Sequence, residues 1–144
     1  TEFNLRGEVA AFDGKPAAIA RSADGTIYVL LASKGRVAIV APPRSWSSTV
    51  STGSFRVSGI DLRGADWELA DPVAIALDDL GRLYVLDARS RSVAVFDSQG
   101  QRVARLAPAK GDPGQLHSPE AVAVDGSGRV YVLDHRQGRV LRYQ

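Results

Sequence analysis

The stretch 72–87 reads PVAIALDDLGRLYVLD, and its pattern occurs at two other places in the chain. The segments that contain it align without gaps at residues 15–41, 71–97 and 118–144. A proline opens each copy, a glycine follows nine residues later, a tyrosine twelve and a valine twenty-one residues later. These positions are Pro16, Pro72 and Pro119; Gly25, Gly81 and Gly128; Tyr28, Tyr84 and Tyr131; and Val37, Val93 and Val140. Self-similarity at a fixed spacing indicates a repeat architecture.

Each copy predicts three short strands joined by tight turns. The first strands are small and apolar, the second are apolar almost throughout, and the third alternate more clearly. The expected first strands are 18–21, 74–77 and 121–124, the second 27–30, 83–86 and 130–133, and the third 36–40, 92–96 and 139–143. Glycine in the first turn of each copy supplies the positive φ that a tight hairpin needs. A fourth, outer strand is expected over 55–62 and 102–106.

Small sheets that recur every 47 to 56 residues (Pro72 to Pro119, Pro16 to Pro72) predict the blades of a β-propeller. The copies resemble NHL repeats. The matching residues are Pro72, Asp78 or Asp79, Gly81, Tyr84, Asp87 and Val93, and Pro119, Asp125, Gly128, Tyr131, Asp134, Arg139 and Val140. The resemblance implies an all-β fold of three four-stranded NHL-like blades, which form half or part of a six-bladed propeller. Lys34, Ser90 and Gln137 replace an asparagine that the family usually carries, so a ligand read by those asparagines is not expected here.

The whole chain, 1–144, is predicted to be one propeller segment. Its blade cores are about 15–41, 71–97 and 118–144, residues 1–14 hold an outer closing strand at 8–12, and 42–70 is a long linker with an outer strand. Three blades leave two open sheet flanks, and the third unit lacks an outer strand. Either two copies close a six-bladed ring, or the chain is a segment of a larger chain or docks onto other subunits. We favour the second interpretation.

Composition restricts the chemistry. The chain carries a net charge of +2 and no cysteine, which excludes disulfides and thiolate sites. No segment has the roughly 20 apolar residues of a membrane helix. We expect a soluble protein without a cofactor. The composition does not decide its compartment, and a bacterial periplasmic, extracellular or complex-associated protein is favoured over a cytoplasmic one. Its partners are expected to be other proteins or a second copy of itself, with nucleic acid less favoured and no membrane insertion.

The loops between second and third strands of a propeller share one face of the molecule. Here they span 32–36, 88–91 and 135–139, and they are rich in arginine, which suits anions and acidic surfaces. The candidate binding residues on these loops are Lys34, Arg89, Arg91, His135 and Arg136. Arg36 and Arg139 match a structural position of the family and are expected to pair with aspartates.

Two tryptophans lie near the two ends of the long linker. Trp46 lies in the sequence PPRSWSS, which predicts an exposed excursion, and Trp67 follows it. An exposed tryptophan would mark an interface, whereas the alternative is that each ring packs between blades. Both remain candidate binding residues.

No catalytic constellation is visible. The stretches at Asp78–Asp79 and 125–128 resemble acidic calcium loops, but Asp-Gly sequences between strands are expected to be turns. We therefore expect no enzyme, but a non-catalytic interaction module or accessory scaffold that binds through its loop face and open flanks. One alternative is a sensor of anions or RNA on the arginine-rich loops. Another is a metal-dependent hydrolase or lyase formed by a dimer.

Overall fold

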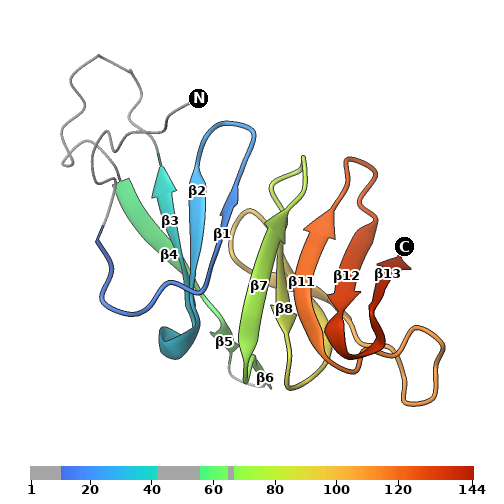
Figure 1. Cartoon of the computed structure of the whole chain (residues 1–144). Coiled ribbons are helices and arrows are strands. Elements are labelled where there is room, and N and C mark those ends of the chain that lie inside the picture. Colours follow the sequence, from blue (N-terminus) through green and yellow to red (C-terminus); the bar gives the residue numbers. More distant parts are fainter. Residues whose placement is uncertain (1–10, 42–55, 65–66) are drawn as a thin grey trace, which may run out of the picture.

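The computed structural model describes residues 11–41, 56–64 and 67–144, which form three antiparallel sheets arranged side by side as propeller blades (Figure 1). Blade 1 contains β1 (Ala18–Arg21), β2 (Ile27–Leu31), β3 (Arg36–Ala41) and β4 (Arg56–Asp61). Blade 2 contains β7 (Pro72–Leu77), β8 (Leu83–Asp87), β9 (Ser92–Phe96) and β10 (Arg102–Leu106). Blade 3 contains β11 (Pro119–Val124), β12 (Val130–Asp134) and β13 (Arg139–Tyr143). The all-β propeller fold is confirmed.

Smaller elements connect the blades. A two-stranded hairpin, β5 (Arg63–Gly64) and β6 (Trp67–Glu68), follows blade 1. Single 3₁₀ turns, η1 (Ala32–Lys34) and η3 (His135–Gln137), join the second and third strands of blades 1 and 3. The closing strand predicted over 8–12 lies mostly outside the described residues, and Ala11 and Phe12 are not in a strand. No helix in the described ranges is long and apolar enough to cross a membrane.

The loop between second and third strands ends on a residue in the left-handed region in all three blades. Gly35 has φ 61° and Gly138 has φ 59°, values that glycine adopts without a Cβ penalty. In blade 2 the equivalent residue is Arg91, with φ 53°. Since the left-handed region is unfavourable for residues with a Cβ, this arginine carries a backbone cost that the two glycines do not.

Each blade carries apolar side chains on two faces, and in blade 2 the second and third strands are buried on both sides. We call the side toward the following blade the front face and the other side the rear face. The front face of blade 1 packs on the rear face of blade 2, with Leu30 and Val37 against Leu83 and Phe96 in one core. The front face of blade 2 packs in the same way on the rear face of blade 3. The repeated interface is the main source of burial in the molecule.

The turn between first and second strands contains a clasp that blades 2 and 3 share. Asp78 accepts hydrogen bonds from Arg82 Nε at 2.6 Å and from the Tyr84 hydroxyl at 3.1 Å. Its other oxygen accepts the backbone N–H groups of Leu80 and Arg82. Asp125 repeats this arrangement with Ser127, Arg129 and Tyr131 at the corresponding positions. These carboxylates are occupied by internal donors, which agrees with a turn rather than a calcium loop.

Candidate functional site: the open blade faces

The front face of blade 3 has no sheet against it within the described chain. Leu133 is 39% exposed and Val140 is 64% exposed. The residues at the same repeat positions in blade 2, Leu86 and Val93, are fully buried under blade 3. Identical residue types at equivalent positions therefore differ only in whether a following blade covers them.

The rest of this face follows the same rule. Ala121 and Ala123 are exposed, whereas their equivalents in blade 2 are buried. One position departs from the pattern: Arg142 stands near the end of β13 where blade 2 carries the buried Val95. A long arginine stem can cover apolar surface while its guanidinium reaches water at the strand end.

The rear face of blade 1 is the second open surface. Ile19 is 70% exposed, although its equivalent in blade 2, Ile75, is only 6% exposed. Phe12 packs against the outer part of the face, on a small core formed by Val29, Leu31 and Ala38. The inner part, around β1, stays open.

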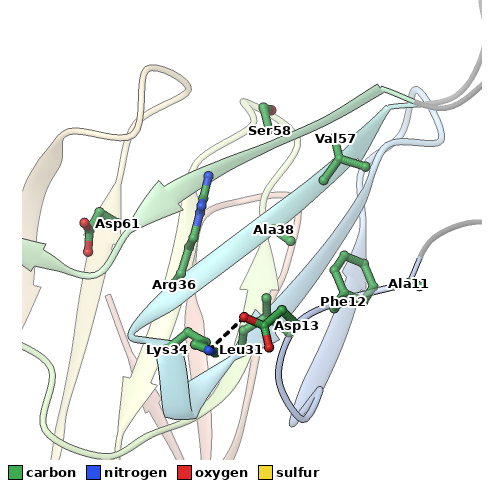
Figure 2. A pocket seen from close by; sticks show the side chains of 10 residues that line it. All are labelled: Ala11, Phe12, Asp13, Leu31, Lys34, Arg36, Ala38, Val57, Ser58 and Asp61. Carbon is green, nitrogen blue, oxygen red and sulfur yellow. Dashed lines mark hydrogen bonds and ion pairs between the residues drawn. The ribbon is translucent and has the colours of Figure 1, made fainter.

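A groove of about 640 Å³ lies beside Phe12 on this rear face (Figure 2). The Lys34 ammonium and the Asp13 carboxylate form an ion pair of 3.0 Å at one side of it. Arg36 extends across the neighbouring strand, where Gly59 leaves room for its guanidinium. The groove combines an apolar floor of Leu31 and Ala38 with charged residues, Asp13, Lys34, Arg36 and Asp61, around it.

The loop residues predicted as a binding face lie at one end of the blades, because all three loops join second to third strands. Arg89, Arg91 and Arg136 are exposed. Lys34 is engaged with Asp13, and His135 Nδ1 lies 3.6 Å from the Glu120 carboxylate of its own blade. The structure thus places these side chains on one side of the molecule, and their role in binding remains a prediction.

Arg139 has a local structural role. Its Nη2 donates to the Gln115 carbonyl at 2.7 Å and its Nη1 to the Pro113 carbonyl at 3.2 Å. It also lies 3.8 Å from the buried Asp134. Burial alone would raise the pKa of Asp134, but the Ser118 and His117 N–H groups and the Arg139 charge lower it below its ordinary value. This network ties the incoming linker to blade 3.

Blade 2 keeps the buried aspartate but not the arginine. Asp87 accepts the N–H groups of Asp71 and Ser90 at 2.8 and 2.7 Å. Ser92 stands where blade 3 has Arg139, and Arg105 from β10 donates to its hydroxyl at 3.1 Å. The sequence shows Ser92 in place of the arginine, but it did not reveal the contact with Arg105, because that arginine comes from the outer strand.

Trp67 packs between blades 1 and 2. Its ring centroid lies 5.4 Å from that of Phe96 and 4.7 Å from the Arg102 guanidinium. The Trp67 indole also lies directly against Gly64 on the paired strand β5. A Cβ on Gly64 would overlap the indole nitrogen, so the absence of a side chain there allows this contact. Trp46 lies outside the described residues. In the described part of the chain, no group of three or more His, Asp or Glu side chains could hold a metal ion.

Comparison with known proteins supports the fold. A family model for the N-terminal region of strictosidine synthase-like proteins matches residues 110–143. No curated protein matches the chain in sequence. Among solved structures, hydrazine synthase from Kuenenia stuttgartiensis is 22% identical with a TM-score of 0.57, and the match covers 97% of this chain and 38% of that one.

Two further structures show the range of proteins that share the fold. Glutaminyl cyclase from Myxococcus xanthus is 12% identical with a TM-score of 0.65, over 97% of this chain and 59% of that one. A chain of a nidogen–laminin complex is 19% identical with a TM-score of 0.60, and the match covers 90% of this chain and 44% of that one. The chain thus spans between 38% and 59% of the length of these three proteins.

These likenesses correct one expectation. We expected no enzyme because no catalytic constellation was visible, but the similar structures include hydrazine synthase and glutaminyl cyclase. The fold is shared by enzymes and binding proteins alike, so the absence of a familiar motif was not a sufficient argument. Together with the recurring Pro, Gly and Tyr positions, the matches identify the chain as part of a β-propeller whose blades resemble NHL repeats.

Proposed function

We propose that this chain is a protein-interaction module of a propeller assembly, and that its two open blade faces bind further blades. The observation that supports the proposal is the exposure of Leu133 and Val140, whose equivalents in blade 2 are fully buried. Full burial of one such side chain stabilises by about 1.5–3 kcal/mol. Since each is only partly exposed, covering both contributes roughly 2 kcal/mol.

The chemistry of the two open faces indicates what covers them. Within the chain, a front face meets a rear face twice, between blades 1 and 2 and between blades 2 and 3. The remaining front face belongs to blade 3 and the remaining rear face to blade 1. A second copy of the chain therefore offers the complementary surface at both ends. Head-to-tail contacts of this kind close into a ring when the rotation allows it.

The proposal is tested by the solution mass of the 144-residue chain, measured by light scattering on a sizing column over a range of concentrations. We expect a concentration-dependent species of twice 15.3 kDa. The double variant Leu133→Asp/Val140→Asp should be monomeric with an unchanged circular dichroism spectrum, because association would bury two carboxylates without partners in the centre of the front face.

A matched control introduces the same two charges away from the open faces. Leu80 and Val103 are also exposed, on the first turn and the outer strand of blade 2. The variant Leu80→Asp/Val103→Asp should associate like the wild type. A wild type that stays monomeric, or a control variant that loses association equally, would contradict the proposal.

A further inference from the structure

Strand β10 contains an irregularity that places two arginines on the same face. Arg102 pairs with Phe96 and Arg105 pairs with Ala94, and the register shifts between Arg102 and Ala104. Residues three apart in a regular strand point to opposite faces, because side chains alternate with a period of two. A bulge adds one residue and re-aims the side chains that follow it. Arg102 and Arg105 therefore share the rear face of blade 2 with Phe96 and Ala94.

A cavity of about 320 Å³ lies where these arginines meet the β5–β6 hairpin. Its lining consists of Trp67, Glu68, Leu69, Ser90, Arg102 and Arg105. The hairpin that connects blades 1 and 2 and the segment after it supply one wall, and blade 2 supplies the other through β10 and the loop before β9.

The two arginines are held in place by different contacts. The Arg102 guanidinium lies 4.7 Å from the Trp67 ring centroid, a cation–π arrangement that leaves its N–H groups free to donate. Arg105 uses Nε to donate to Ser92 at 3.1 Å, which leaves its terminal nitrogens available. The Ser92 hydroxyl in turn hydrogen-bonds the Ser90 hydroxyl at 2.7 Å. The cavity thus presents ordered donors rather than freely rotating side chains.

The charges of the lining do not cancel. Glu68 is the acidic residue of the cavity, and its carboxylate lies 3.2 Å from Arg63 Nε. Across the described ranges, no carboxylate lies within ion-pair distance of Arg102 or Arg105. Two positive charges without a carboxylate partner are expected to attract an anion.

The geometry points to a site for a small oxyanion, a phosphate or carboxylate group, held by the guanidinium groups of Arg102 and Arg105 with the Ser90 hydroxyl as a further donor. Guanidinium groups bind both kinds of oxyanion through paired N–H bonds. This site lies between blades 1 and 2, so it does not depend on the covering of the open faces.

The experiment is a titration followed by the indole N–H signal of Trp67 in proton–nitrogen NMR spectra. The Trp46→Phe background leaves one indole signal, since the chain has two tryptophans. Inorganic phosphate and acetate are titrated separately at constant ionic strength with chloride. We expect a saturable shift with at least one of them, and the anion that saturates at lower concentration identifies which oxyanion the site prefers.

Charge-removing variants connect the signal to the site. Arg105→Gln and Arg102→Gln should each weaken binding at least tenfold. Arg105→Lys, which keeps a charge, should retain part of it. The control Arg56→Gln removes an exposed arginine from β4 and should leave the titration unchanged. A shift that does not saturate with either anion, or equal affinity in Arg105→Gln, would overturn the proposal.

Discussion

Arg91 is the residue where one substitution tests the repeat geometry most cleanly. It is the one non-glycine residue of the described chain with a positive φ, at 53°, and it stands where blades 1 and 3 carry glycine at φ 61° and 59°. Replacing Arg91 with glycine keeps the backbone path and removes the contact between Cβ and the backbone. We therefore expect Arg91→Gly to stabilise the domain.

The magnitude follows from two opposing terms. The left-handed conformation costs a residue with a Cβ about 1–2 kcal/mol. Glycine loses more conformational freedom on folding, which costs about 0.5–1 kcal/mol. The net gain is then about 0.5–1 kcal/mol, or roughly 2–4 °C in Tm for a chain of this size. Thermal unfolding at fixed protein concentration measures it, because association would otherwise shift Tm.

A reciprocal variant provides the control. A Cβ on Gly138 would meet nothing within 4 Å, so Gly138→Ala changes the backbone preference and adds no collision. It should lower stability by about 1 kcal/mol. If Arg91→Gly lowered Tm instead, the equivalence of the three loops would be wrong, and the arginine side chain would have to contribute contacts that outweigh the backbone cost.

Three further predictions concern packing and pH. Gly64→Ala should displace the Trp67 indole, lowering stability by about 1–3 kcal/mol and weakening the near-ultraviolet dichroism; an unchanged spectrum would argue against the close approach. Burial alone would raise the pKa of Asp125, but hydrogen bonds from neighbouring N–H groups lower it from 3.8 to about 2. Its contribution to stability is therefore complete above about pH 4 and lost as the pH falls toward 2. Asp125→Asn should remove this pH dependence from the free energy of unfolding measured with urea. Leu86→Ala should cost about 2–5 kcal/mol, whereas Leu133→Ala should cost less than about 1 kcal/mol in a monomer; equal losses would show that the front face of blade 3 is already covered.

The strands could be predicted from the sequence because each rests on a local pattern. The apolar second strands and the glycine turns recur three times, and repetition removes the ambiguity of any single copy. The predicted outer strand over 102–106 coincides with β10. The turn interpretation of Asp125 also agrees with its hydrogen bonds, because an aspartate before a tight turn binds backbone N–H groups.

The features that were missed depend on contacts between distant segments. The bulge in β10 has no proline or glycine to mark it, so the sequence alone would place Arg102 and Arg105 on opposite faces. The position of Trp67 depends on Gly64 and on a ring from another blade. Such arrangements follow from the packing of blades, which no local pattern encodes. The expectation of no enzyme was also wrong. It rested on the absence of a familiar catalytic motif, and the propeller fold is shared with enzymes.

The central claim is that two copies meet head to tail, the front face of blade 3 of one against the rear face of blade 1 of the other. Distances between labels on different copies test it most directly. The chain contains no cysteine, so single cysteines can be placed at Ala23 and Ser127, both exposed in the first turns of blades 1 and 3. Chains labelled at one position are mixed with chains labelled at the other, and spin–spin distances are measured. A head-to-tail ring predicts short distances between the two positions of different copies, on the scale of the roughly 10 Å that separates stacked sheets. No dipolar coupling between mixed labels, or short distances only between identical positions, would contradict it.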